Sequence, residues 1–372
     1  MLEALWDLPT PALVVDEHVV VARYLEMRRA LPDVAPYYAV KANPAPVVLQ
    51  ALARAGAGFD VASIAEFDLV EELVDPVEGV LFSNPVKPAG HVAQAYARGV
   101  RHFAFDSEQE LRKLARHAPG ARVHVRLAVD DSTSLFPLSR KFGVSSDEGH
   151  RLLLLAGELG LEPYGVTFHV CSQCTDVSAW PLAIARCGLL LRQLHRSGVA
   201  LSMLDLGGGF PARYTDPVPS TAALAAAIRS ALDRLPHRPR RLVCEPGRYL
   251  VAESGLLVAS VLAVTDRADG RWVYLDVSGY HGLMEALQTG GRWQFPIHTT
   301  ADRPDGPRVP CTVTGPSCDS SDTLFYGALL PADLAEGDRV VIGSAGAYTT
   351  SYATHFNGFP PPVVVPASAL AR

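Results

Sequence analysis

The feature that most constrains the fold is a regular alternation of short apolar runs with segments of helical periodicity. The expected strands are residues 37–40, 59–62, 79–82, 102–105, 122–127, 165–170, 202–206 and 241–245. The expected helices include residues 46–55, 64–74, 107–116, 148–159, 180–197 and 221–235, and Ser63 and Asp106 stand where helix N-caps belong. Eight such units over roughly 210 residues predict an α/β fold with a parallel (β/α)8 TIM barrel. A doubly wound open sheet is the structural alternative.

The last third of the chain follows a different pattern. Its expected strands are residues 256–264, 272–277, 308–314 and 339–343, and Pro and Gly, not helices, separate them. We therefore expect a barrel domain over residues 26–248 and a C-terminal all-β domain over residues 249–372. Residues 1–25 complete the second domain, because the apolar run 12–16 precedes the first barrel strand and can pair into its sheet.

Composition and charge argue against several classes of protein. The 372 residues carry a formal net charge of −6, which opposes binding to a phosphate backbone, so we expect no nucleic-acid partner. The longest apolar stretch, residues 249–264, contains Glu253 and is shorter than the ~20 residues of a membrane-spanning helix, so we expect no membrane association. The first residues lack the basic region of a secretory signal, and six cysteines are too few for a disulfide framework. A cytoplasmic protein is expected.

The pair Cys171 and Cys174 forms a single CxxC motif. A structural zinc site needs a second pair of ligands, and the sequence offers no matching spacing of cysteine or histidine near this one. We therefore expect no metal, and interpret these thiols as residues that line a site or fill the core.

The C-terminal ends of the strands carry function in a (β/α)8 barrel, and here they carry reactive side chains. The residues at or just after these ends are Lys41, Asp60, His169, Gly207, Gly208, Gly209, Glu245 and Arg248. Each has an ordinary interpretation alone, such as a solvated lysine, a core histidine or a flexible turn. Together they fit pyridoxal 5′-phosphate (PLP): a lysine can bind it covalently, glycine amides can hold its phosphate, and a carboxylate can keep its pyridine nitrogen protonated.

Longer segments carry a family resemblance. They are PYYAVKAN (36–43), GFDVAS (58–63), FSNPVK (82–87), FAFDSEQEL (103–111), RLAVDDS (126–132), SRKFG (139–143), FHVCSQCTD (168–176), LDLGGGFP (204–211), EPGRYLVA (245–252), GPSCDSSD (315–322) and GAYTTSYATHFNGF (346–359). In these segments the chain resembles the fold-type III PLP-dependent ornithine/diaminopimelate/arginine decarboxylases, most of all the ornithine/lysine decarboxylases. The resemblance implies an alanine racemase-like fold, a PLP-binding barrel with a C-terminal β domain. It also implies decarboxylation of L-ornithine or L-lysine to putrescine or cadaverine, as in polyamine biosynthesis.

The resemblance also implies roles for the matching barrel residues. Lys41 is implied to bind PLP covalently, His169 to stack on its ring, and Asp60 to lie close to the cofactor. The residues implied to hold or approach the phosphate are Ser172, Gly207, Gly208, Gly209, Gly247, Arg248 and Tyr348. Glu245 is implied to face the pyridine nitrogen, where an opposite charge favours the protonated form.

Three residues of the second domain are implied to meet the substrate. Cys318 and Asp319 match a Cys-Asp pair that family members insert from the partner subunit, which implies a homodimer with shared active sites. Cys318, or else Lys41, is implied to return a proton to the substrate Cα. Asp319 and Asp276 are implied to bind a distal ammonium group, whose charge would be costly to leave unpaired. Without the resemblance, Cys318 would be interpreted as a core thiol.

Two departures bear on the substrate. Cys171 stands where the family usually has glycine, and Pro137 where many ornithine enzymes have arginine. Diaminopimelate decarboxylases usually show CESxD and GAYG, whereas this chain has CDSSD and GAYT, which favours a basic substrate without a second carboxylate. The alternatives are decarboxylation of diaminopimelate, arginine, a D-amino acid or a substrate of specialised metabolism, an alanine racemase-like enzyme, and a non-catalytic decarboxylase-like regulator.

Overall fold

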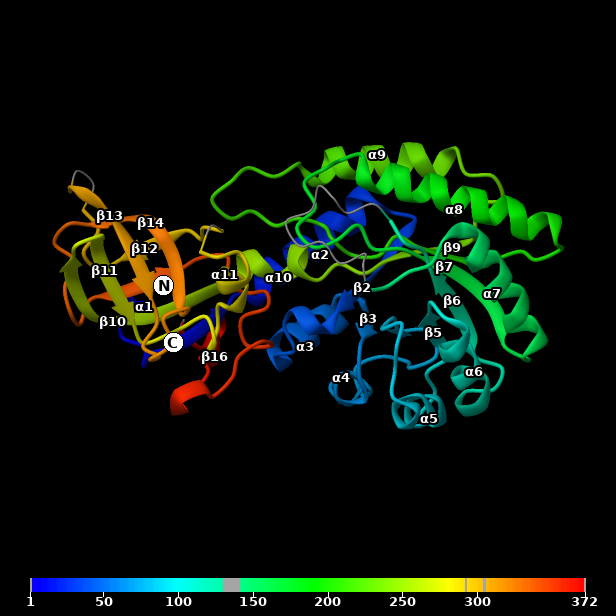
Figure 1. Ribbon diagram of the computed structural model, residues 1–372, viewed down its shortest axis with the longest axis horizontal. Helices are drawn as coiled ribbons and strands as arrows, with labels where there is room; N and C mark the ends of the chain where they lie inside the picture. Colours follow the sequence, from blue (N-terminus) through cyan, green and yellow to red (C-terminus); the bar gives the residue numbers. More distant parts are fainter. Residues whose placement is uncertain (1, 130–140, 292, 304–305, 371–372) are drawn as a thin grey trace. The chain divides into compact units, whose positions relative to one another are not determined.

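The computed structural model describes residues 2–129, 141–291, 293–303 and 306–370. The chain divides into two compact units (Figure 1). The barrel unit comprises Val21–Pro211 and Val218–Leu250, and the sheet unit comprises Met1–Val20, Ala212–Pro217 and Val251–Arg372. Each unit is described by itself.

The barrel unit is built on a closed ring of parallel strands. In ring order these are β2 (Val34–Ala39), β3 (Gly58–Val61), β4 (Val80–Phe82), β5 (His102–Phe105), β6 (Arg122–Arg126), β7 (Glu162–Thr167), β8 (Met203–Asp205) and β9 (Arg241–Cys244), and β9 pairs with β2 to close the ring. Every predicted barrel strand is confirmed, to within a few residues at its ends, and the open-sheet alternative is wrong. The strands are short and apolar because the ring buries both of their faces.

Helices connect consecutive strands (Figure 1). They are α2 (Glu17–Ala30), the 3-10 turn η1 (Val40–Ala42), α3 (Pro46–Arg54), α4 (Ile64–Asp68), α5 (Ala89–Ala97), α6 (Glu108–His117), α7 (Ser146–Glu158), α8 (Ala179–Arg196), α9 (Thr221–Asp233) and α10 (Arg248–Val251). Ser63 caps α4 as predicted, since its hydroxyl accepts the Glu66 N–H. The prediction for Asp106 is wrong: Ser107 is extended and caps α6 through the Glu110 N–H, while Asp106 accepts the Gly143 N–H at 2.9 Å.

The N-terminal end of the barrel is closed by ion pairs. Glu78 bridges Arg122 and Arg241, at 2.7 Å from each guanidinium, and these arginines begin β6 and β9. The Tyr37 hydroxyl donates a hydrogen bond to the Glu78 carbonyl at 2.6 Å. This arrangement joins four segments at the end of the barrel that contributes to stability, and leaves the opposite end for a ligand.

The sheet unit is built on one extended sheet, in which some neighbouring strands are antiparallel and others are parallel. Its strands run in the order β12 (Ile297–Thr299), β15 (Arg339–Ile342), β10 (Gly255–Arg267), β11 (Gly270–Leu275), β13 (Arg308–Thr314) and β14 (Thr323–Pro331), with β1 (Ala12–Val15) beside β10 and β16 (Val363–Pro366) beside β1. Its short helical segments are α1 (Leu2–Trp6), η2 (Ala252–Ser254), α11 (Met284–Gln288), η3 (Phe356–Gly358) and η4 (Ala367–Leu370). The predicted pairing of the N-terminal run into this sheet is confirmed by the antiparallel β1–β10 ladder.

Three strands of the sheet unit were not predicted. β14 contains Gly327 at φ +68°, and its ladder with β13 shifts register, so the apolar alternation that marks a strand is interrupted. β12 has three residues, and β16 follows three consecutive prolines. Such segments carry too short a pattern to be distinguished from loops.

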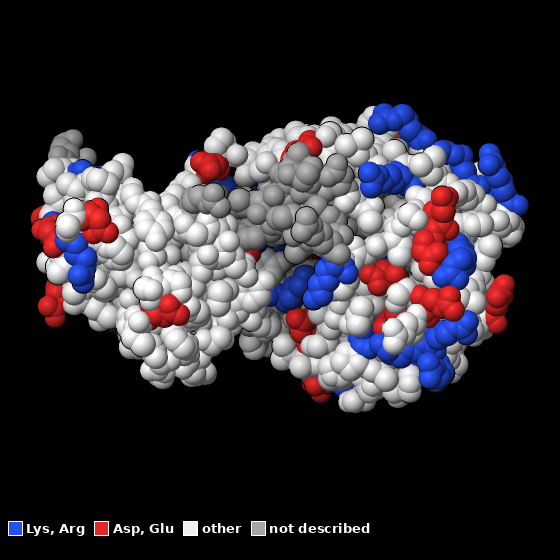
Figure 2. Space-filling model, viewed as in Figure 1, with Lys and Arg blue, Asp and Glu red and all other residues white. Residues whose placement is uncertain are grey.

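None of the helices in the described residues is long and apolar enough to cross a membrane. On the face shown in Figure 2, basic side chains lie at the upper right, over the ends of α8 and α9, and acidic side chains are interspersed below them.

Candidate active site

A cavity of about 420 Å³ lies at the C-terminal ends of the barrel strands. Its lining residues are Lys41, Asp60, Ala62, Ser83, Asn84, Pro85, Arg126, Lys141, Phe142, His169 and Glu245. Four of the residues predicted from strand ends, namely Lys41, Asp60, His169 and Glu245, therefore meet in one cavity. The rule that strand ends converge at a barrel mouth accounts for this, although the residues span more than 200 positions of sequence.

Lys41 forms an ion pair inside this cavity. It lies in η1, directly after β2, and its Nζ is 3.0 Å from Asp60 Oδ2 at the end of β3. The Lys41 side chain is 44% exposed, whereas Asp60 is 3% exposed, so the amine is accessible while its partner is fixed. A lysine held in this way is available to react with a carbonyl compound.

The chain offers few other lysines for such a reaction. It contains only four: Lys41, Lys87, Lys113 and Lys141. Lys87 is fully buried and, like Lys113, forms an ion pair with Glu110, at 3.1 Å and 2.5 Å respectively. Lys41 and Lys141 are thus the lysines that line the cavity.

His169 lies in the cavity as a neutral imidazole. Burial, together with the positive charges of Arg126 and Lys41, lowers the pKa of His169 well below its usual range. Its Nδ1 accepts the Cys171 N–H at 2.9 Å, which assigns the ring proton to Nε2 and fixes the orientation of the ring. A neutral, oriented ring is suited to stacking on a planar cofactor.

The glycine turn after β8 is packed too closely for any side chain. Gly207 and Gly209 have φ of +60° and +96°, and a Cβ on either would collide with the backbone carbonyl of Phe168 or Cys171. A Cβ on Gly208 would lie 2.7 Å from the Glu245 carbonyl oxygen and 3.0 Å from His169 Nε2. The turn is therefore in contact with the segments after β7 and β9. The Gly207 N–H donates to Asp205 Oδ1 at 2.9 Å, so the amides of Gly208 and Gly209 are the ones that can approach an anion closely.

Arg248 lies beside this turn. It is buried, and its guanidinium donates to Ser172 Oγ, with Nη2 at 2.9 Å. Gly247 precedes it, and α10 begins at Arg248. The structure thus brings together the two predicted phosphate-binding side chains of the barrel unit, from the segments after β7 and β9.

Glu245 completes the barrel mouth. It is 8% exposed, and its Oε1 is a buried oxygen without a hydrogen-bond partner among the described residues. Burial, followed by the charges of Asp205 and Asp60, raises the pKa of Glu245 well above its usual range. A buried oxygen without a partner is costly and marks a place where a donor belongs. The lysine, the glycine turn, the Arg248–Ser172 pair and this oxygen together fit PLP.

Several residues that line the cavity, or interact with its lining, had no role in the sequence-based prediction. Arg126 ends β6 and lines the cavity, so the strand-end rule could have found it. Glu66 accepts the Ala62 N–H at 2.7 Å and interacts electrostatically with Asp60 and Lys41, but lies one helical turn beyond a strand end. Ser83, Asn84 and Pro85 follow β4 and form one wall.

A buried ion-pair network holds that wall. The Lys87 Nζ donates to the carbonyl oxygens of Asn84 and Ala104 at 2.7 Å and 2.6 Å, and pairs with Glu110 at 3.1 Å. Burial lowers the pKa of Lys87 to about 8. The loop after β4 is thereby attached to β5 and α6, which gives Lys87 a structural role.

Four predicted site residues belong to the sheet unit, where each has local partners. Cys318 is exposed, and its N–H and thiol both contact Asn357 Oδ1, at 3.1 Å and 3.4 Å. Tyr348, at φ +58°, stacks on Tyr352 with ring centroids 5.7 Å apart. Their roles at the barrel cavity stay predictions.

The two predicted acidic residues have different surroundings. Asp319 accepts hydrogen bonds from the Tyr280 hydroxyl at 2.9 Å and the Ser321 hydroxyl at 2.6 Å, and these bonds lower the pKa of Asp319. Asp276, just after β11, accepts the Ser260 N–H at 2.8 Å, and burial raises its pKa. The contacts of Asp276 support a structural role in the β10–β11 pair, and its contact with substrate stays a prediction.

The backbone conformation at Cys171 explains why the family usually has glycine at this position. It is fully buried and has φ of +74°, a left-handed conformation that costs an L-residue about 1–2 kcal/mol. We expect Cys171→Ala to be less stable than Cys171→Gly by ~1 kcal/mol, although glycine removes more atoms. Denaturant unfolding of the two cofactor-free variants measures the difference, since both lack the sulfur and differ only by the Cβ. A more stable alanine variant would contradict this account of the strain.

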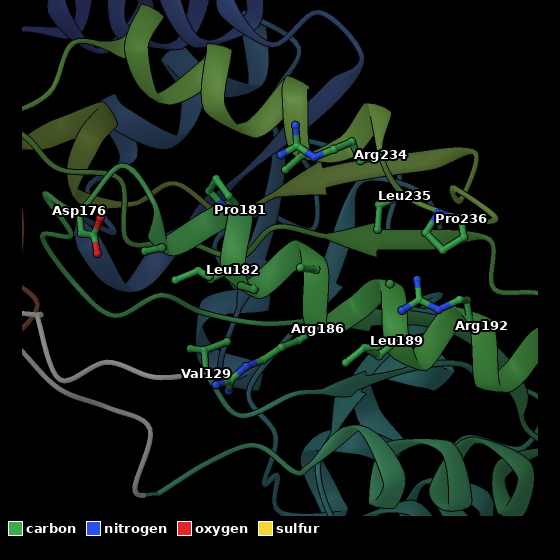
Figure 3. Close-up of a pocket in the computed structure, with 15 residues that line it drawn as sticks. Val129, Asp176, Pro181, Leu182, Arg186, Leu189, Arg192, Arg234, Leu235 and Pro236 are labelled. Atoms are coloured by element: carbon green, nitrogen blue, oxygen red, sulfur yellow. The ribbon is translucent and has the colours of Figure 1, made fainter.

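A larger cavity, of about 610 Å³, lies on the helical side of the barrel unit (Figure 3). It runs along α8 to the end of α9. Within it, Arg186, Arg192 and Arg234 surround Leu182 and Leu189. None of the predicted site residues lines it. The candidate active site is therefore the smaller cavity at the barrel mouth.

Fold and site together define a (β/α)8-barrel protein built to hold PLP through a lysine, a glycine turn and a buried carboxyl group. Comparison with known proteins identifies the family. Residues 17–252 match the pyridoxal binding domain of the pyridoxal-dependent decarboxylases, and the chain belongs to this family. PLP is the cofactor of the family, and the protein is a PLP-dependent amino-acid decarboxylase.

Individual relatives are similar over nearly the whole chain. The lysine/ornithine decarboxylase of Selenomonas ruminantium is 37% identical over 353 residues, which are 95% of this chain and 88% of that protein. The crystal structure of lysine/ornithine decarboxylase from Vibrio vulnificus, complexed with cadaverine, aligns with a TM-score of 0.87 and 33% identity over 97% of this chain and 95% of that one. Antizyme inhibitor 2 of Xenopus laevis is 35% identical over 93% of this chain and 78% of that protein.

Proposed function

We propose that this protein decarboxylates L-ornithine or L-lysine and releases putrescine or cadaverine with CO₂. The observation that carries the proposal is the barrel-mouth cavity, in which the Lys41–Asp60 pair, His169 and the unpartnered Glu245 oxygen face one space. The basic substrate is supported by the names of the similar decarboxylases and by the CDSSD segment, which supplies Asp319.

The barrel residues bind and orient the reactants in this proposal. Lys41 would hold PLP covalently, His169 would cover its ring, and Glu245 would accept a hydrogen bond from its pyridine nitrogen. Ser172, Arg248 and the glycine turn Gly207–Gly209, through the amides of Gly208 and Gly209, would hold the phosphate, together with Gly247 and with Tyr348 of the sheet unit. When bound, PLP supplies an electron sink for the pair of electrons that the departing CO₂ leaves behind.

The sheet unit supplies the remaining groups in this proposal. Asp319 binds the distal ammonium of the substrate as an ion pair, because a charge without a partner would be costly there. Cys318 would return a proton to the substrate Cα, and the Lys41 amine would assist release of the product. Cys318 and Asp319 act in the active site of the partner subunit, so a homodimer is the active form.

The substrate assignment is tested by product analysis. Purified protein with PLP is incubated separately with L-ornithine, L-lysine, L-arginine, meso-diaminopimelate and the D-forms, and the amines are identified by mass spectrometry. We expect putrescine or cadaverine as the dominant product, and none from a Lys41→Ala control. Dominant decarboxylation of arginine, diaminopimelate or a D-amino acid would overturn the substrate assignment and leave the PLP-dependent reaction in place.

A further inference from the structure

A second buried carboxyl group, that of Asp205, lies directly beside Glu245. Asp205 is the last residue of β8 and is fully buried. Its Oδ1 accepts the Gly207 N–H at 2.9 Å, and its Oδ2 accepts the Thr167 hydroxyl at 2.9 Å. Asp205 is therefore held rigidly and itself fixes the first glycine of the turn after β8.

The carboxyl groups of Asp205 and Glu245 hydrogen-bond to one another, and the backbone keeps the two segments adjacent, since the Glu245 N–H donates to the Gly207 carbonyl oxygen at 2.8 Å. Two ionised carboxylates are both acceptors only, so this bond requires a proton on one of them. Burial raises the pKa of Asp205 to about 6, and burial with the charges of Asp205 and Asp60 raises that of Glu245. The pair titrates as one unit, in which the first ionisation opposes the second.

The charges around the pair favour retention of a proton. The titratable and charged groups that face it are Lys41, Asp60, Arg126, His169, Cys187 and Cys244. The imidazole is neutral, and burial raises the pKa of both thiols, so they are neutral as well. Lys41 and Arg126 are positively charged, and Asp60, Glu66 and Asp106 are acidic groups that interact with them. A second negative charge on the buried pair would add to these acidic groups, which favours retention of a proton.

We propose that Asp205 is a positioning residue that shares one proton with Glu245 in the cofactor-free protein. The shared bond fixes the Glu245 carboxyl by one oxygen and leaves Oε1, which has no partner among the described residues, for a donor in the cavity. The protonated pyridine nitrogen of PLP is such a donor. Because Asp205 also fixes Gly207, one side chain connects the carboxyl group that faces the ring with the turn that faces the phosphate.

The shared proton is tested by the pH dependence of unfolding, without cofactor or activity. Between pH 5 and pH 6 the folded pair holds at least one proton, because the pKa of both buried carboxyl groups is raised, whereas unfolded Asp and Glu, with pKa values near 4, have released theirs. The stability from this proton is full below pH ~4 and is lost as pH rises through the folded pKa. For each unit of pH, we expect the unfolding constant of the wild-type protein to increase by a factor at least about tenfold larger than that of Asp205→Asn.

The matched variant Glu245→Gln sharpens this test. In either variant the new amide N–H can donate to the remaining carboxylate in place of the shared proton, so Glu245→Gln is expected to show the same reduced slope as Asp205→Asn. A wild-type slope in either variant would assign the proton to one carboxyl alone and overturn the proposal. If Asp205→Asn does not fold, the infrared band of a protonated carboxyl at pH 6, compared between wild type and Glu245→Gln, decides instead: its presence in both would contradict sharing.

The positioning role is tested by PLP affinity. Asparagine at position 205 can still accept the Gly207 N–H and donate to Glu245, so we expect Asp205→Asn to retain affinity within about threefold, whereas Asp205→Ala loses at least about tenfold. Asp233→Asn, the same change at a 72% exposed position at the end of α9, controls for the change in net charge. Wild-type affinity in Asp205→Ala would overturn the positioning role.

Discussion

Replacing Lys41 with alanine is expected to abolish both turnover and the visible absorption band of the bound cofactor. Among the described residues, no other lysine of the barrel-mouth cavity pairs with a buried carboxylate. The Lys41 side chain is 44% exposed, so its amine is accessible. We expect decarboxylation to fall by at least about 10³-fold, because covalent binding of the cofactor and release of the product both depend on this amine. Absorption spectra and amine formation measure the two effects on the same sample.

The control for Lys41→Ala is Lys113→Arg. Lys113 pairs with Glu110 and does not line the cavity, and arginine preserves its charge. We expect this variant to retain its absorption band and to lose less than about twofold in activity, as most substitutions away from a site do. A Lys41→Ala protein that still shows the band, or still turns over, would contradict the assignment of Lys41.

Mixing two inactive variants, Lys41→Ala and Cys318→Ala, is expected to restore activity. If each site uses Lys41 from one subunit and Cys318 from the other, a heterodimer carries one intact site and one doubly altered site. Random re-association of equal amounts yields one intact site in half of the dimers, or roughly 25% of the wild-type number of sites. Activity is measured after subunit exchange, which two different affinity tags confirm.

The complementation also has an internal control. A mixture of Lys41→Ala with Lys41→Arg gives heterodimers in which no site has the amine, so it is expected to stay inactive. If the Lys41→Ala and Cys318→Ala mixture also stays inactive although tagged heterodimers form, Lys41 and Cys318 do not act from different subunits, and the shared-site proposal is wrong.

The barrel could be predicted from sequence because its strands are apolar on both faces and its helices are periodic. The same regularity located Lys41, Asp60, His169 and Glu245, since each follows a strand whose C-terminal end must lie at the mouth. Arg126 satisfies the same rule and was overlooked. Glu66 could not be found in this way, because it reaches the site from a helix and its side chain is placed by a hydrogen bond to Ala62.

The sequence pattern was less informative wherever backbone conformation decides the structure. β14 escaped prediction because Gly327 interrupts its alternation, and Ser107 replaced Asp106 as the cap of α6 because its backbone is extended there. The contact between Asp205 and Glu245 likewise could not be predicted from the sequence alone. It depends on the adjacency of β8 and β9, which the closed ring of strands establishes.

The most direct test of the central claim, that the barrel mouth binds PLP through Lys41, is chemical mapping of the attachment point. The PLP-loaded protein is reduced with borohydride, which fixes the cofactor on its lysine, then digested and analysed by mass spectrometry. The chain has four lysines, so the map has only four possible positions. We predict modification of Lys41 alone; modification of Lys87, Lys113 or Lys141 instead, or of no lysine in a protein that has bound PLP, would contradict the account.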